Sequence, residues 1–204
     1  MSHSQCLSMP TESALKVNFD IMRLNSSKIR TSALYALLAL LLITVITATA
    51  LDPVAVVSYE RDIWHHLSVY RELIAAPFDA ANPHVATDDP SRSYTPWTLS
   101  IALLARMMGL DQFGAITLSA IGSTFLILIG GFLFARNYWK RDYAPLIFLI
   151  VLFGTWLDPI DHTGYTTPTT SLFSIAYPYA SALGMGFFSW WLALRSLHVN
   201  KHLW

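Results

Sequence analysis

Residues 31–51 read TSALYALLALLLITVITATAL and contain no charged side chain. Three further runs without charge cover residues 112–135, 143–157 and 163–194. A helix needs about 20 apolar residues to cross a bilayer core of roughly 30 Å, and three of these four runs reach that length. Because lipid offers no partner for backbone amides, the runs are expected to be helical.

The overall composition also favours a membrane protein over a soluble domain. Of the 204 residues, 54% are hydrophobic and 13% are charged, and a soluble domain usually carries roughly twice that charged fraction. The formal net charge is zero, so no basic field indicates a nucleic-acid partner. We therefore predict an all-α polytopic membrane protein with about four or five apolar helices and the lipid bilayer as its surroundings.

The first apolar run is interpreted as an uncleaved anchor helix. Ala48-Thr49-Ala50 resembles the cleavage site of a signal peptide, but about thirty residues precede the run, and it is longer than the apolar part of a signal peptide. Residues 1–30 are predicted to form a flexible cytoplasmic tail, and residues 31–204 a transmembrane helical domain. The single cysteine, Cys6, excludes an intramolecular disulfide.

Residues 52–95 form a long polar segment with seven acidic residues and three arginines. Basic residues concentrate in cytoplasmic loops, so this segment and residues 158–174 are predicted to be outer loops. Four apolar residues of the first loop recur at helical spacing: Ile63, Leu67, Tyr70 and Ile74. This spacing predicts an amphipathic helix from about 61 to 75 that lies along the membrane surface.

Two interpretations remain open for residues 95–135. An apolar stretch up to Arg106 is followed by a turn at 109–111 and then by the second long apolar run. If both stretches crossed the membrane, the basic cluster at 136–141 would lie outside, against the positive-inside bias. Either 95–109 is a short helix that does not cross, which we slightly favour, or the bias is broken here.

The outer loops carry the candidates for acid–base chemistry and metal binding. On a helix, Asp62 shares a face with His65 and His66, and a carboxylate beside histidines can act as a general base. Solvation of an interfacial helix is the alternative role for the same residues. Six side chains offer oxygen and nitrogen ligands for a divalent metal ion: Asp62, His65, His66, His84, Asp161 and His162. Hydrogen bonding of these histidines to water or headgroups is the alternative.

Arginines in the acidic loop are candidates for phosphate binding. Arg61, Arg71 and Arg92 are separated along the loop, and a guanidinium group matches a phosphate with two parallel hydrogen bonds. One of them could therefore hold a lipid phosphate. Salt bridges to neighbouring carboxylates are the other interpretation.

A series of short motifs runs through both outer loops. They are Asp62-Ile-Trp-His-His66, Pro77-Phe78-Asp79, Asn82-Pro83-His84, Asp89-Pro90, Tyr94-Thr-Pro96, Gly164-Tyr165 and Ala176-Tyr177-Pro178. Together these motifs, over about residues 31–190, resemble the N-terminal part of bacterial polytopic glycosyltransferases with the GT-C architecture. In that superfamily the first outer loop carries an acidic catalytic base, and the donor is a polyprenyl-phosphate-linked sugar. The resemblance implies a multi-pass protein of the bacterial inner membrane with a cytoplasmic N-terminus.

The resemblance also assigns roles to residues of this sequence. It implies that Asp62 is the catalytic base, with Glu60 as the second choice and His66 as a companion of the carboxylate. Arg61 or Arg92 would stabilise the departing phosphate. The remaining candidates for substrate binding are His65, His84 and Tyr165. Because such enzymes usually have ten or more helices, the chain resembles their N-terminal part or a shortened relative.

A non-enzymatic membrane subunit is the alternative function. The last predicted helix, from about 175 to 194, carries small residues at Ala180, Ser181, Ala182, Gly184 and Gly186. Small residues let helix backbones approach closely, which suits packing on other membrane subunits. An accessory protein that binds lipid or metal through His66 and His162 is a third interpretation.

Overall fold

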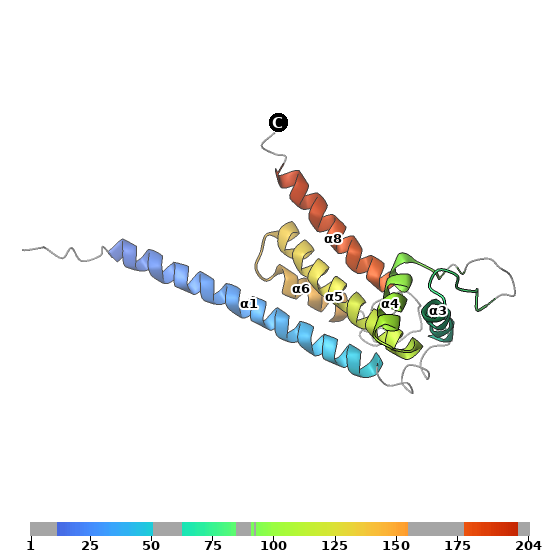
Figure 1. Cartoon of the computed structure of the whole chain (residues 1–204). Coiled ribbons are helices and arrows are strands. Elements are labelled where there is room, and N and C mark those ends of the chain that lie inside the picture. Colours follow the sequence, from blue (N-terminus) through green and yellow to red (C-terminus); the bar gives the residue numbers. More distant parts are fainter. Residues whose placement is uncertain (1–11, 51–62, 85–90, 92, 155–177, 200–204) are drawn as a thin grey trace, which may run out of the picture.

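All the regular elements in the described part of the chain are α-helices. The structure, a computed structural model, describes residues 12–50, 63–84, 91, 93–154 and 178–199, with the side chains of the first helix from Ile29 to Ala48. The helices are α1 (Glu12–Ala50), α3 (Ile63–Ala75), α4 (Pro96–Met107), α5 (Gln112–Trp139), α6 (Ala144–Gly154) and α8 (Pro178–Val199) (Figure 1). The all-α prediction is therefore confirmed.

Helix α5 lies at the centre of the bundle and contacts the five other helices. Its tightest contact is with α8, where a Cβ atom built on Gly130 would lie 2.8 Å from the carbonyl oxygen of Gly184. A Cβ on Gly184 would lie 2.6 Å from Cβ of Leu126. The small-residue face predicted for residues 180–186 therefore packs, at Gly184, inside this chain. At Gly186 an added Cβ would meet no atom within 4 Å.

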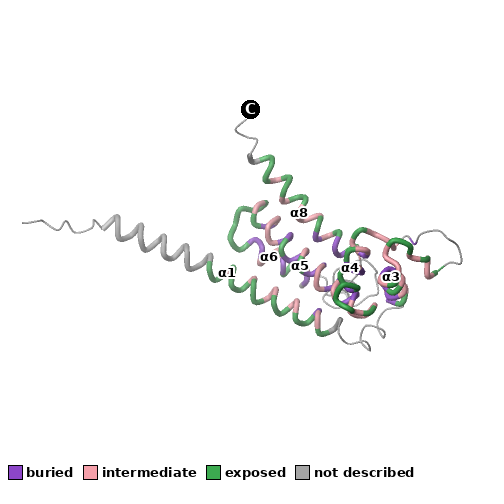
Figure 2. Tube along the Cα trace, viewed as in Figure 1, coloured by how far each residue is buried: buried purple, intermediate pink, exposed green. Residues whose placement is uncertain are grey.

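Two of the helices are long and apolar enough to cross a membrane. They are Ile29–Ala48 within α1 and Gln112–Trp139, which is α5. Within an apolar 18-residue window of each helix, 6% of the residues are buried in the α1 segment, against 50% in α5. Leu37, Leu40 and Leu41 of α1 are exposed, and Figure 2 shows the described part of α1 as mostly exposed or intermediate. Such a continuous exposed apolar surface is unfavourable in water and favourable in lipid. The fold is thus compatible with a helical membrane protein.

The other predicted spans are less complete in the described residues. Helix α6 has 11 residues, which rise about 17 Å. Helix α8 has 22 residues, which rise about 33 Å, but it is not among the described helices that are both long and apolar enough to cross a membrane. Four or five membrane spans therefore remain a prediction.

Several helix boundaries differ from the prediction, including the end of α8 at Val199 instead of about 194. Helix α1 begins at Glu12 instead of about 31, so residues 12–30 of the expected flexible tail are helical. Neither proline nor glycine interrupts this stretch, so the helix of the apolar run can continue towards the N-terminus. Helix α5 passes through Arg136 to Trp139 and ends where Lys140 adopts a left-handed conformation, with φ 52°.

Helix α4 is short and capped at its start. It has 12 residues, which rise about 18 Å and do not span a bilayer core of roughly 30 Å. Its N-cap, Thr95, and Thr98 bind each other's backbone N–H groups in a capping box. The predicted turn follows, with Gly109 at φ 67°. This length agrees with the first interpretation of residues 95–109.

The predicted amphipathic helix is α3, and Ile63, Leu67 and Tyr70 are buried as the spacing indicates, whereas Ile74 is only partly buried. The helix packs on α4 and α5. Its apolar face is therefore covered by protein, although the sequence predicted contact with the membrane surface. The physical reason is that α4 and the start of α5 together present an apolar surface beside it, including Ile101, Ala102 and Ala115.

Arg106 links α4 to the C-terminal end of α3 by hydrogen bonds. Its Nη1 donates hydrogen bonds to the carbonyl oxygens of Ile74 at 3.1 Å and Ala75 at 3.0 Å. These carbonyls belong to the last turn of α3, where intrahelical partners are lacking and a cation is favourable.

Arg106→Gln is therefore expected to lower the free energy of unfolding by about 1 kcal/mol. Thermal unfolding of the protein in mild detergent would measure the change. Arg71→Gln is the matched control, because Arg71 is exposed and, among the described residues, pairs with neighbouring Glu72, a type of contact worth little. Equal melting temperatures for the two variants would contradict the role of Arg106.

Candidate functional site

The structure describes four of the candidate site residues: His65, His66, Arg71 and His84. Arg71 forms a salt bridge with Glu72, which is the alternative that the sequence left open for it. Five others lie outside the described residues: Glu60, Arg61, Asp62, Arg92 and Tyr165. The proposed metal ligands Asp161 and His162 lie outside them as well. Since α3 begins at Ile63, Asp62 directly precedes the helix that carries His65 and His66.

The three described histidines form a cluster. The rings of His65 and His84 stack with centroids 4.0 Å apart and planes inclined by 21°. The ring of His66 meets that of His65 edge-on, with centroids 5.3 Å apart. His84 reaches α3 from the loop after it, because the helix ends before Pro77 and the chain turns back. The structure thus brings two separate sequence motifs together.

Two serines hold the stacked rings. Nε2 of His65 lies 2.5 Å from Oγ of Ser93, and Nε2 of His84 lies 3.1 Å from Oγ of Ser68. The Ser68 hydroxyl donates its one proton to the carbonyl oxygen of His65 at 2.7 Å, so it must accept from His84. In neutral His84 the proton is therefore on Nε2, and Nδ1 carries the lone pair.

The start of α4 positions Ser93. The buried Thr98 hydroxyl lies 3.0 Å from the carbonyl oxygens of both Ser93 and Thr95 and shares its one proton between them, so the capping box of α4 also helps to position the partner of His65. Next to Ser93, the hydroxyl of Tyr94 donates to the carbonyl oxygen of Ala81. Burial, and then the negative charge of Glu72, raise the pKa of Tyr94. This tyrosine therefore stays protonated and joins the two loop segments.

A buried polar layer lies between α3, α4 and α5 near this cluster. The indole N–H of Trp97 donates to Oγ of Ser119 at 2.9 Å. Burial raises the pKa of Tyr70 to about 12, and the nearby Ser119 lowers it in part. No described group makes a regular hydrogen bond to the Tyr70 oxygen. Tyr70 is therefore a neutral core residue and a poor candidate for acid–base chemistry.

The described residues do not form a metal-binding site. In residues 12–50, 63–84, 91, 93–154 and 178–199, no group of three or more His, Cys, Asp or Glu side chains is placed to hold a metal ion. The stacking of His65 on His84 explains part of this result, because stacked rings direct their in-plane nitrogen lone pairs outward and not at a common point. The predicted divalent ion remains a prediction that needs residues outside this part.

The sequence analysis did not predict the roles of Ser68 and Ser93. The signal for Ser68 was its position three residues after His65 on a helix, where side chains share a face. Ser93 had no comparable signal, because its contact depends on how α4 packs on α3.

No family model, curated protein or solved structure matches this chain.

Proposed function

We propose that the chain is a GT-C-like membrane glycosyltransferase, or the N-terminal part of one, which transfers a sugar from a polyprenyl-phosphate donor. The observation that supports this proposal best is the stacked pair His65–His84, held by Ser68 and Ser93. His65 of this pair follows Asp62, the candidate base, by three residues in a polar part of an otherwise apolar chain. Organised imidazoles that lie close in sequence to a carboxylate suit the binding of sugar hydroxyls and the transfer of their protons.

The arrangement of charge along the bundle supports an orientation. Helices α3 and α4 lie at the end of α5 where it begins, and the basic residues Arg136 and Lys140 lie at its other end (Figure 1). The positive-inside bias then assigns the basic end to the cytoplasm and the histidine cluster to the outer surface of a bacterial inner membrane. A polyprenyl-phosphate donor would meet the cluster from the outer leaflet.

In the proposed reaction, Asp62 takes the proton of an acceptor hydroxyl. The hydroxyl oxygen attacks the anomeric carbon, the bond from that carbon to the phosphate oxygen breaks, and the phosphate leaves with the electron pair. Arg61 or Arg92 would stabilise the charge of the leaving phosphate. The Nδ1 lone pair of His84 can accept a hydrogen bond from a sugar hydroxyl.

The proposal is tested by transfer of labelled sugar from polyprenyl-phosphate donors in proteoliposomes. The double variant His65→Phe, His84→Phe keeps two stacked rings but removes every ring nitrogen, and we expect it to lower the rate at least about tenfold. Trp64→Phe is the control, since Trp64 is exposed on the same turn of α3. Full activity of the double variant would refute the proposal. Absence of transfer by the wild-type chain would exclude a complete enzyme and leave the N-terminal part of one as the form to test.

A non-enzymatic membrane subunit is the second candidate. It is favoured by the open surface at Gly186, where an added Cβ would meet nothing within 4 Å, and by the neighbouring exposed side chain of Met185. In this case the histidine variants would have no effect. Gly186→Leu would release co-purifying membrane proteins while the chain itself stays folded.

A further inference from the structure

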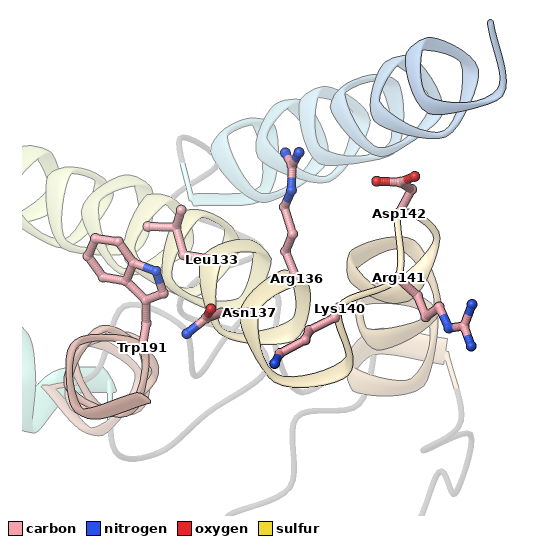
Figure 3. A pocket seen from close by; sticks show the side chains of 7 residues that line it. All are labelled: Leu133, Arg136, Asn137, Lys140, Arg141, Asp142 and Trp191. Atoms are coloured by element: carbon pink, nitrogen blue, oxygen red, sulfur yellow. The ribbon is translucent and has the colours of Figure 1, made fainter. Parts of the chain in front are cut away.

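A pocket of about 340 Å³ lies at the other end of the bundle, where α5 turns into α6. Figure 3 shows its lining side chains, which come from the end of α5, the turn itself and Trp191 of α8. Three of them are cations, Arg136, Lys140 and Arg141, and one is a carboxylate, Asp142. The excess of positive charge indicates an anionic ligand.

Two further features of the pocket suit a phosphate headgroup. Nδ2 of Asn137 is buried and has no hydrogen-bond partner within the described residues, so this lining residue offers an unused donor. Trp191 presents an indole ring beside it, and the guanidinium of Arg195 lies 5.7 Å from the centre of that ring. Tryptophan and arginine are typical of the level of lipid headgroups in a membrane.

An apolar groove of about 270 Å³ adjoins the basic pocket. Its walls are Trp139, Tyr143, Ile147, Phe148 and their neighbours along α6, together with Arg141. Arg141 therefore lines both the basic pocket and the groove. In Figure 3 its side chain extends away from α5, whereas Lys140 extends towards the side of Asn137 and Trp191. A ligand that occupied both the pocket and the groove would have an anionic group attached to an apolar chain.

We propose that this site binds an anionic phospholipid, with its phosphate held by the cations of the basic pocket and one acyl chain in the groove along α6 that Arg141 also lines. Charge complementarity assigns the headgroup, and the continuous apolar groove favours a lipid over a soluble phosphate. The inference rests on the proposed membrane placement and does not depend on sugar transfer.

A purely structural role of the cations is the competing explanation. Arg136 and Lys140 lie at the C-terminal end of α5, where positive charge stabilises the last carbonyl groups. That role would operate in any lipid. Lipid specificity is therefore the property that separates the two explanations.

The test uses the purified full chain and two probes, phosphatidylglycerol and the zwitterionic phosphatidylcholine. Bound lipids are counted by native mass spectrometry during titration, and the melting temperature is measured in parallel. The test variant is Lys140→Asn with Arg141→Gln, because asparagine tolerates the left-handed conformation at position 140. Arg30→Gln is the control, because it removes a cation at an exposed position of α1 that does not line the pocket.

We expect the wild-type chain to prefer phosphatidylglycerol and to melt at a higher temperature in its presence. The test variant should lose at least about tenfold in affinity for phosphatidylglycerol and the increase in melting temperature, while the control variant keeps both. Equal binding of the two lipids, or unchanged binding by the test variant, would overturn the proposal. Displacement of the lipid by inorganic phosphate would overturn the assignment to a lipid. Since no sugar donor is present, these outcomes are independent of the transferase proposal.

Discussion

Replacing Asp62 by asparagine is expected to lower the rate of sugar transfer by about 10²–10⁴-fold, the usual contribution of a general base. Asparagine has nearly the same shape as aspartate but cannot take a proton at neutral pH. The change therefore removes the base without opening space around it. Initial rates with labelled polyprenyl-phosphate sugar, at saturating donor and acceptor, would measure this loss.

Two further variants are needed to interpret the result for Asp62→Asn. Asp79→Asn is the matched control, because Asp79 is an exposed carboxylate after α3 and its substitution changes the net charge equally. Glu60→Gln tests the second choice for the base. If Glu60→Gln lost most of the transfer rate while Asp62→Asn stayed active, Glu60 would be assigned as the catalytic base. Full activity of both variants would contradict base catalysis by this loop.

Local patterns predicted the helices well where neighbours in sequence decide the structure. The spacing of Ile63, Leu67 and Tyr70 predicted the buried face of α3, because residues three and four apart share one face of a helix. The glycine at 109 likewise predicted the turn between α4 and α5, since its φ of 67° is unfavourable for other residues. Charge-free runs predicted α5 and the apolar part of α1 for the same local reasons.

Contacts between distant segments could not be predicted in this way. The stacking of His65 on His84 needs the loop after α3 to return to the helix, and no periodicity encodes that return. The basic residues around Lys140 were recognised as a signal for orientation. Their pocket also needs Trp191 of α8, which is about fifty residues away in the sequence.

The contacts of the small residues in α8 were likewise only partly predictable from the sequence. Sequence spacing predicted a face suited to close packing, but it could not tell which helix is the partner. In the structure Gly184 uses that face against α5 of the same chain, while Gly186 stays open. The packing was thus predictable as a property of the helix surface, and the identity of its neighbour was not.

Gly184→Leu is expected to destabilise the chain by about 3 kcal/mol, at the upper end of the usual cost of overpacking. A Cβ at this position would lie 2.6 Å from Cβ of Leu126 and 2.8 Å from the backbone nitrogen of Ile127. Backbone atoms in the middle of α5 cannot move aside as a flexible side chain can. Helix α8 must therefore shift away from α5, and the close contact with Gly130 is lost as well.

Gly186→Leu is the matched control for this prediction, since it lies on the same helix and an added Cβ would meet nothing within 4 Å. Both substitutions replace glycine within a helix, which by itself favours the helix by up to about 1 kcal/mol. The difference between the two variants therefore isolates the contact of α8 with α5. Thermal unfolding in mild detergent would measure it. If Gly184→Leu melts like Gly186→Leu but releases another protein, then Gly184 packs on a separate subunit, and the non-enzymatic interpretation becomes the better one.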